Sequence, residues 1–338
     1  MNLFPALAAL AALIASEASA QSPGLQALSI DAPHHGRAMT GALFYPTDAD
    51  GPSQDFGKNR VFEGVEVMPN ADPSASAHPL VLLSHGMGGT VRSLTWLAHG
   101  LADRGAVVVV INHPNSTWGD FDLAKATAHW TRAEDMQVAL DHVLEDPTFG
   151  ALIDTDRIMA AGFSFGGWTA LSLGGVRGNH AGYADHCEVY GEASNHCADM
   201  IAAGVSLDEI SAEAWNASYR DTRVTHIAAI DPGFVWGLEA VDVADSIANV
   251  RLVGLGDGED RLLATDFDQS GLINLLPGAT VQRFAPAVHL SALPQCSAIG
   301  AAILLDEGEP PVCTDPPGAD RATIHVEIVD ALAQDLGL

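Results

Sequence analysis

The 338-residue chain predicts a doubly wound α/β fold with a mostly parallel sheet. Two apolar runs, 79–84 and 106–111, show no alternation with polar residues, which is typical of strands buried on both faces of a parallel sheet. Helical patterns separate these runs and the strands that follow, so strand and helix alternate along the chain. With 48% hydrophobic residues, the chain is long enough for one large domain.

The expected elements run from residue 79 to the C-terminus. Upstream we expect only a strand at 42–45 and then a long irregular segment over 47–78, which is rich in Asp, Gly, Pro, Asn and Ser. The expected strands are 79–84, 106–111, 157–161, 224–230, 250–255 and 281–285. The expected helices are 92–104, 132–145, 167–173 and 322–336.

The connection before the strand at 224–230 is too long for an ordinary loop, at about fifty residues. It contains Cys187 and Cys197. We therefore predict that about 175–222 form a disulfide-pinned cap, inserted into a single domain that spans 21–338.

The first twenty residues have the pattern of a secretion signal. An apolar run from Leu3 to Ala15 precedes Ala18-Ser19-Ala20, the small-x-small pattern that signal peptidases accept. We predict a signal peptide over 1–20, cleaved near Ala20, and a secreted or periplasmic protein. The run is too short to span roughly 30 Å of hydrocarbon, and no other stretch approaches about 20 apolar residues, so no stable membrane insertion is expected.

The four cysteines form two sequence-local pairs, Cys187 with Cys197 and Cys296 with Cys313. In an oxidising compartment, pairing within each couple is the simplest of three possible connectivities. Four buried thiols are the alternative. A zinc site is disfavoured because none of these cysteines belongs to a C-x-x-C pair.

The formal net charge is −28, and Lys58 and Lys125 are the only lysines. Such a surface repels nucleic acid and anionic membranes, so neither is an expected partner. A saline habitat would favour this composition, which is a hypothesis about environment and not about the reaction. We expect no cofactor and no metal.

Residues 162–167 read G-F-S-F-G-G, directly after a predicted strand and before a predicted helix. A serine in such a turn projects its hydroxyl above the sheet, and the glycines permit the strained, tightly packed turn. Ser164 is therefore the predicted nucleophile. The start of the helix also offers unpaired N–H groups where an oxyanion forms, and we assign that role to the N–H of Phe165.

A second glycine-rich turn, 85–89, follows the strand at 79–84. Glycines there allow a backbone N–H to point into the site, and we predict that Met87 N–H completes the oxyanion hole. A plain strand-to-helix turn is the alternative. His85 is expected to order the turn and not to act in chemistry.

The general base is expected after the serine, near the last strands. His289 lies just past the strand at 281–285. His325 lies on the amphipathic terminal helix, where we interpret it as a surface residue. The remaining candidates lie in the predicted cap: His180, His186 and His196. His289 is therefore the predicted base.

Two strand ends offer a carboxylate to orient the imidazole of His289 and stabilise its positive charge. Asp231 ends one buried strand, where an isolated carboxylate is costly without a partner, and this favours Asp231. Asp260 is the alternative. It belongs to an acidic cluster that could equally be a solvated loop or a calcium site, together with Asp257 and Glu259.

These motifs resemble those of the bacterial predicted dienelactone hydrolases and the related platelet-activating-factor acetylhydrolases. Residues 84–89 resemble their S-H-G-L-G-G turn, and 161–167 resemble their G-H-S-F-G-G elbow, with Phe163 where histidine is usual. The H-P dipeptide of 112–114 is similar as well. The family ending of a histidine, two cysteines and D-R-A-x-I-H resembles His289, Cys296, Cys313 and 320–325.

The resemblance implies an α/β-hydrolase fold, ester hydrolysis and the pair Cys296–Cys313. For the acid it points both ways, because the acetylhydrolases take it from the position of Asp231 and the dienelactone hydrolases from that of Asp260. Leu290-Ser291 departs from the aromatic residue that often follows the histidine.

The sequence thus predicts an exported, cofactor-free hydrolase of small carboxylic esters that acts through an acyl-enzyme. A lipase or phospholipase A2-like enzyme, or a polyester hydrolase, is the alternative within the enzymes. A covered pocket would favour small soluble esters, and an open apolar rim would favour lipid or polymer. A non-catalytic exported binding protein with the same fold is the alternative outside the enzymes. The sequence does not indicate an oligomeric state.

Overall fold

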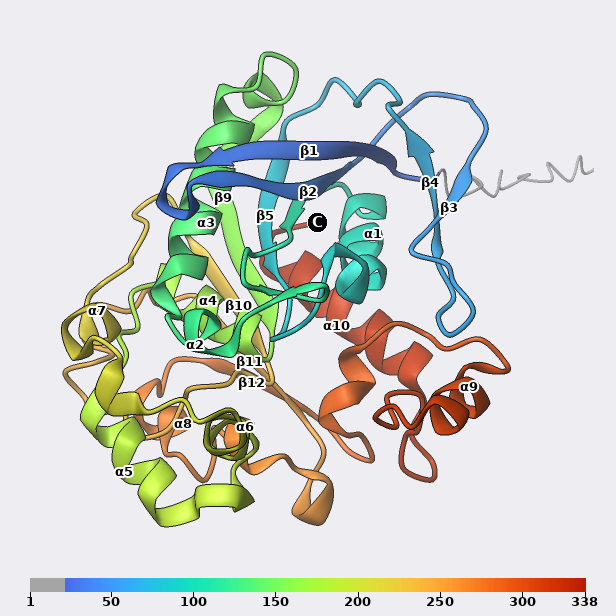
Figure 1. The fold of residues 1–338 in the computed structure, drawn as a ribbon. Helices are drawn as coiled ribbons and strands as arrows, with labels where there is room; N and C mark the ends of the chain where they lie inside the picture. The colour runs from blue at the N-terminus through green and yellow to red at the C-terminus, as the bar shows by residue number, and fades with distance from the viewer. Residues whose placement is uncertain (1–21) are drawn as a thin grey trace, which may run out of the picture.

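The computed structural model describes residues 22–338, and the predicted signal peptide and its cleavage position lie outside them (Figure 1). A ten-stranded sheet has the order β12-β11-β10-β9-β5-β6-β2-β1-β4-β3. Its strands are β1 (Gly24–Ala32), β2 (Arg37–Tyr45), β3 (Gln54–Phe56), β4 (Val65–Pro69), β5 (His78–Ser84), β6 (Val107–Ile111), β9 (Ile153–Phe163), β10 (His226–Ile230), β11 (Val250–Leu255) and β12 (Thr280–Phe284). A small separate ribbon consists of β7 (Ser116–Thr117) and β8 (Asp120–Phe121).

Six neighbouring strands of the sheet are parallel: β6, β5, β9, β10, β11 and β12. This confirms the predicted doubly wound α/β class. In this parallel part of the sheet β5 comes first in the chain. The next strand, β6, pairs with one edge of β5, and β9 pairs with the other edge. The strand order therefore reverses at β5. The loops after β5 and β9 leave the sheet together at its carboxyl edge, which is where parallel α/β sheets carry their sites.

Helices cover both faces of the sheet (Figure 1). Helices α1 and α10 contact each other and share one apolar core with the sheet, and α3 and α4 pack together in the other. The helices are α1 (Thr95–Asp103), α2 (Leu123–Ala126), α3 (Trp130–Glu145), α4 (Phe165–Leu173), α5 (His180–Tyr190), α6 (Asn195–Ala203), α7 (Ala212–Asn216), α8 (Leu272–Leu275), α9 (Gly300–Glu307) and α10 (Arg321–Asp335). No helix within 22–338 is both long and apolar enough to cross a membrane.

The N-terminal part of the sheet corrects the sequence prediction. We expected one strand at 42–45, but β1 and β2, of nine residues each, form an antiparallel hairpin. The segment expected to be irregular contains β3 and β4. Along β1 buried and exposed residues alternate, because one face of the strand meets the core and the other meets solvent. The polar residues on the solvent face make the segment resemble a loop in the sequence.

The segment expected to form a cap contains α5, α6 and α7, and a disulfide joins Cys187 of α5 to Cys197 of α6, as predicted. A cluster of rings packs this segment against the loop after β10. It consists of Tyr183, His186, His196, Trp215, Phe234 and Trp236. The segment is thus attached to the sheet at the carboxyl edge, beside the predicted site.

Candidate active site

Ser164 lies between the end of β9 and the start of α4, as predicted for the nucleophile. Its backbone has φ 56° and ψ −119°, in a region that non-glycine residues rarely occupy. Its N–H donates to Ile230 O at 2.8 Å, and its carbonyl accepts from Gly233 N–H at 3.0 Å. The turn is therefore held in its strained conformation by the neighbouring β10 and the loop that follows it.

Two glycines of the turn are required by close backbone approach. A Cβ on Gly166 would lie 1.9 Å from Ser84 O, and a Cβ on Gly162 would lie 2.3 Å from Gly166 O. Any side chain at either position would force the turn and the end of β5 apart. The sequence G-x-S-x-G is thus explained at this site by contact distances.

Ser164, His289 and Asp231 form one continuous hydrogen-bonded chain. The Oγ of Ser164 lies 3.0 Å from His289 Nε2, and His289 Nδ1 lies 2.5 Å from Asp231 Oδ2. Ser164 is 5% exposed and Asp231 is fully buried. The three residues come from the carboxyl ends of β9 and β10 and from the loop after β12, and the fold brings them together across 125 residues of sequence.

Asp231, and not Asp260, approaches the imidazole. Asp231 accepts from Thr265 Oγ1 at 2.9 Å and from Leu255 N–H at 3.1 Å, and it forms an ion pair with Arg261. Asp260 lies on the surface of the loop after β11. The loop after β11 therefore contributes the buried side chain of Arg261 to Asp231, and not a carboxylate to His289.

The imidazole of His289 is neutral at neutral pH. Burial lowers its pKa below the ordinary value of 6.5, and the positive charge of Arg261 lowers it further. A neutral ring that donates through Nδ1 to Asp231 has a free lone pair on Nε2, which can accept the hydroxyl proton of Ser164. The electrostatics therefore suit a general base.

Phe163 and His196 enclose this hydrogen-bonded chain. The ring of Phe163 lies 4.5 Å from that of His289, between centroids, so the residue that departs from the family elbow packs against the imidazole. His196 of α6 stacks on Phe234 at 5.0 Å, and a Cβ on Gly233 would lie 2.5 Å from its Cε1. Helix α6 thus contacts the loop that begins with Asp231.

Met87 and Phe165 lie on the two backbone segments that meet at Ser164. Phe165 is the first residue of α4. The backbone N–H groups of Met87 and Phe165 have no hydrogen-bond acceptor among residues 22–338. A Cβ on the adjacent Gly86 would lie 3.3 Å from Ser164 Cβ, so the turn after β5 touches the serine. Two free N–H donors on these segments are the requirement of an oxyanion hole.

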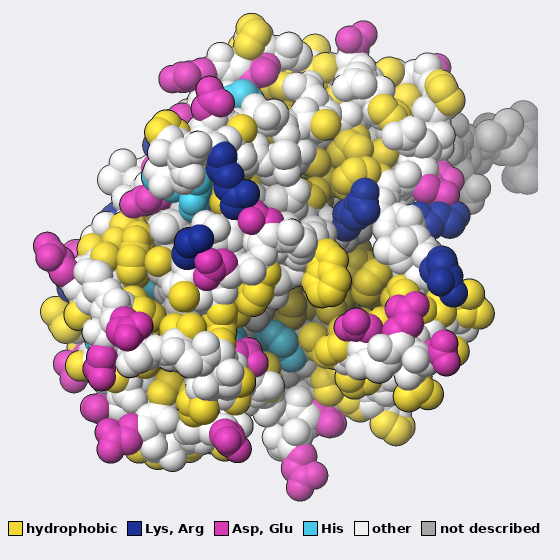
Figure 2. All heavy atoms as spheres, in the orientation of Figure 1, with side chains coloured by type: hydrophobic (Ala, Val, Ile, Leu, Met, Phe, Trp, Pro, Cys, Tyr) yellow, Lys and Arg dark blue, Asp and Glu magenta, His cyan; other side chains and the backbone are white. Residues whose placement is uncertain are grey.

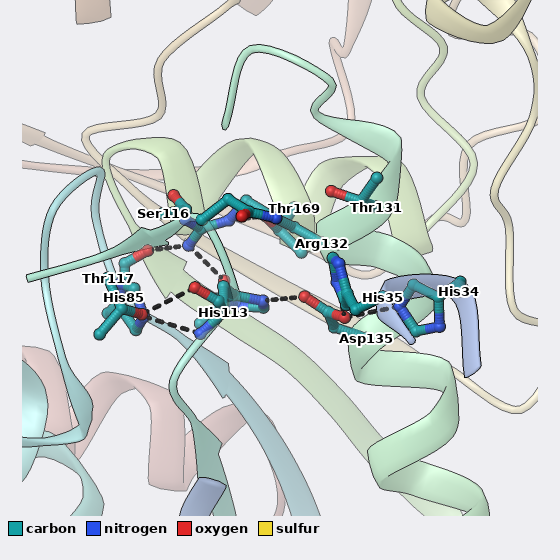
Figure 3. Close-up of polar contacts among 12 residues, drawn as sticks. His34, His35, His85, His113, Ser116, Thr117, Thr131, Arg132, Asp135 and Thr169 are labelled. Atoms are coloured by element: carbon teal, nitrogen blue, oxygen red, sulfur yellow. Dashed lines mark hydrogen bonds and ion pairs between the residues drawn. The ribbon is translucent and has the colours of Figure 1, made fainter. Parts of the chain in front are cut away.

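A buried arginine that the sequence analysis missed supports this turn. Arg132 of α3 donates to His85 O, to Ser84 Oγ at 3.1 Å and to Ser116 Oγ at 2.6 Å (Figure 3). His85 orders the turn as expected, since its ring contacts Gly86 O at 2.7 Å and Thr117 Oγ1 at 3.2 Å. Arg132 carries no sequence signal beyond being, with Asp135, a charged residue on a helix face that is otherwise apolar.

His113, from the family-like H-P dipeptide, extends the network to α3. Its Nε2 lies 2.9 Å from Ser84 Oγ and its Nδ1 lies 2.8 Å from Asp135 Oδ2 (Figure 3). Burial, and then the charge of Arg132, lowers the pKa of His113 to about 4. The ring is therefore neutral, donating through Nδ1 to Asp135 and accepting from Ser84.

The loop that carries His289 is held by the C-terminal segment. Ser291 Oγ donates to Asp315 at 2.6 Å, Arg321 pairs with Asp315, and the predicted disulfide joins Cys296 to Cys313. The surface interpretation of His325 was wrong. Its side chain is buried, stacks on Trp96 and contacts Ser291 O at 2.9 Å, because the helix face expected to meet solvent is covered by this loop.

An open cavity of about 780 Å³ begins at the turn after β5, where Met87 contributes to its wall. Its lining is mostly apolar and includes Leu25, Phe56, Phe62, Val91, Trp118 and Leu293. Trp118 is 75% exposed and Phe121, on the adjacent β8, is 49% exposed. Figure 2 shows hydrophobic side chains around a hollow near the centre of this face, on a surface otherwise dotted with acidic groups. This is an open apolar rim and not a closed pocket.

A comparison with solved structures identifies the fold. A solved ferulic acid esterase from Streptomyces cinnamoneus superimposes with a TM-score of 0.57 over 96% of this chain and 91% of its own, at 18% sequence identity. The likeness establishes the α/β-hydrolase fold.

Sequence similarity to curated proteins is partial. Lipase 1 of Moraxella sp. strain TA144 is 40% identical over 81 residues, which are 24% of this chain and 23% of the lipase. Cutinase cut1 of Thermobifida fusca is 29% identical over 174 residues, which are 47% of this chain and 51% of the cutinase. The chain thus matches about half of that cutinase's length and less of the lipase's. No protein-family profile matches the chain.

Proposed function

We propose that the protein is an exported serine hydrolase that cleaves carboxylic esters through an acyl-enzyme. The observation that carries the proposal is the hydrogen-bonded chain from Ser164 through His289 to Asp231. Partial similarity to a lipase and to cutinases supports an ester substrate. Two disulfides suit an oxidising compartment and support export.

In the first half-reaction, Ser164 Oγ attacks the acyl carbon while His289 Nε2 takes its proton. Asp231 keeps the Nδ1 proton in place and stabilises the imidazolium. The N–H groups of Met87 and Phe165 donate to the tetrahedral oxyanion. His289 then protonates the leaving alcohol. In the second half-reaction water attacks the acyl-enzyme while His289 takes its proton, and the acid leaves as Ser164 is protonated again.

The open apolar cavity favours esters with an extended apolar or aromatic portion over small soluble esters. Ser164 and His289 do not line this cavity, and Met87 is the residue that it shares with the proposed oxyanion hole. An apolar portion bound there would extend away from Met87 and cover the exposed ring of Trp118. The lipase or polyester-hydrolase alternative is therefore preferred to hydrolysis of small esters. We propose that about 175–222 act as a cap, since His196 contacts the loop that begins with Asp231.

The nucleophile is tested with Ser164→Ala, using a fluorophosphonate probe and p-nitrophenyl esters of increasing acyl length. We expect loss of labelling and a fall in turnover of about 10⁶, with the fold unchanged. Ser172→Ala, on the same helix α4, is the matched control and should label normally. Labelling or near-normal turnover in Ser164→Ala would contradict the assignment, and an inactive wild-type protein would favour the binding-protein alternative.

A further inference from the structure

A second group of chemically active side chains lies away from Ser164, where the β1–β2 hairpin meets α3. His34 and His35 form the tip of the hairpin, between Pro33 and the left-handed Gly36. Asp135 faces them from α3 (Figure 3). The proposed ester hydrolysis uses none of the three.

The two imidazoles converge on one carboxylate oxygen. His34 Nε2 lies 2.7 Å from Asp135 Oδ1, and His35 Nε2 lies 2.8 Å from the same atom. The three atoms that could bind an ion lie within 4.8 Å of one another. An ion held at about 2.0–2.2 Å from each of them needs only small ring movements to fit.

The surroundings resemble those of a metal site. Asp135 is fully buried, and its second oxygen, Oδ2, is fixed by His113 Nδ1 at 2.8 Å, which is the outer contact that orients a carboxylate ligand. His34 is on the surface, so an ion has an entry path and solvent can fill its remaining positions.

We propose that His34, His35 and Asp135 bind a divalent transition-metal ion of the zinc class. The site offers two imidazole nitrogens and one carboxylate oxygen, a ligand set that suits zinc and other late first-row transition metals. Calcium and magnesium fit poorly because they prefer oxygen ligands. The ion would clamp the tip of the hairpin to α3 and stabilise the edge of the sheet. This site differs from the expectation of no metal. About a hundred residues separate the two histidines from Asp135, and no spacing motif connects them, so the sequence carries no signal for it.

The test uses the full mature chain stripped with a chelator and then titrated with Zn²⁺ alone by calorimetry, with thermal unfolding measured in parallel. We expect one equivalent to bind and to raise the melting temperature. His34→Gln and His35→Gln should each weaken binding at least about tenfold and abolish the rise in melting temperature. Glutamine can still hydrogen-bond to Asp135, so the fold should persist in both variants. Asp135 itself is left unchanged because it also fixes His113.

His142→Gln is the matched control, since His142 lies on the same helix but outside the cluster. It should bind Zn²⁺ as the wild type does. The proposal is overturned if the wild type binds no Zn²⁺ below millimolar concentration, if both cluster variants keep wild-type affinity, or if His142→Gln loses as much. Equal binding of Ca²⁺ would also overturn it, because that outcome would reflect the acidic surface alone. The readouts do not depend on ester hydrolysis.

Discussion

The loops after β10 and β11 both carry an aspartate at the same edge of the sheet, but the two side chains differ in burial and in their partners. Asp231, directly after β10, is fully buried and is contacted by Arg261, Thr265 and the N–H of Leu255. Asp260, after β11, stays on the surface. The loop after β11 contributes a cation and a hydroxyl to the acid of its neighbour.

The difference shows that a carboxylate can be buried only where other groups bind it. An ionised group removed from water is stable only when hydrogen bonds and an opposite charge compensate its desolvation. Asp231 has all of these, and they also fix which oxygen faces His289. Asp260 needs none, because water solvates it.

The largest effect is expected from Asp231→Asn. The amide would favour the wrong imidazole tautomer, and we expect turnover to fall by up to about 10⁴ with KM nearly unchanged. The measurement is steady-state kinetics on a p-nitrophenyl ester. Asp260→Asn is the matched control and should change turnover little. A large loss in Asp260→Asn beside a near-normal Asp231→Asn would reverse the assignment of the acid.

Arg261→Gln tests whether the cation contributed by the second loop sets the pH range. The base works only when His289 is neutral, so turnover is lost as pH falls through its pKa. Arg261 lowers that pKa, so removing the charge should move the acid limb of the kcat/KM profile upward, by about 1 pH unit. Stability should also fall by about 3–5 kcal/mol, because a buried ion pair loses one partner. An unchanged acid limb in a folded variant would contradict this role.

Thr265→Val removes only the hydroxyl that donates to Asp231 Oδ2 and keeps the shape of the side chain. A hydrogen bond to a charged group contributes about 1.5–3 kcal/mol, so we expect a smaller loss of stability than for Arg261→Gln. Urea unfolding of the two variants side by side measures the difference. Equal losses would mean that the ion pair with Arg261 adds nothing beyond the hydrogen bond that the uncharged hydroxyl of Thr265 donates to the same carboxylate.

Much of the central sheet could be predicted from the sequence because burial on both faces leaves continuous apolar runs. The run at 250–255 matches β11 in both bounds. The edge of the sheet could not be predicted as well, because β1 is buried on one face only and its polar residues hide the strand. Local spacing was sufficient for the disulfides, since each joins residues 10 or 17 positions apart.

For the proposed site, the sequence predicted the residues that chain order constrains and missed those that only packing reveals. Ser164 and His289 each stand next to a recognisable strand end. Arg261 is adjacent to Asp260 in sequence, but nothing in the sequence shows which of the two side chains turns inward. The choice depends on the path of the loop after β11, where a 3₁₀ turn over Gly258–Asp260 leaves the acid outside.

The close approach of Gly166 to Ser84 O has a consequence for how the proposed activity could diverge. The segments that carry Met87 and Phe165 approach each other backbone to backbone, with no side chain between them at this point. Their separation is consequently fixed by atomic radii before any substrate arrives, so little reorganisation energy is spent when charge develops on the bound oxygen. Changes in substrate preference would therefore have to arise in the apolar walls of the cavity, where side chains can change without disturbing the two donors.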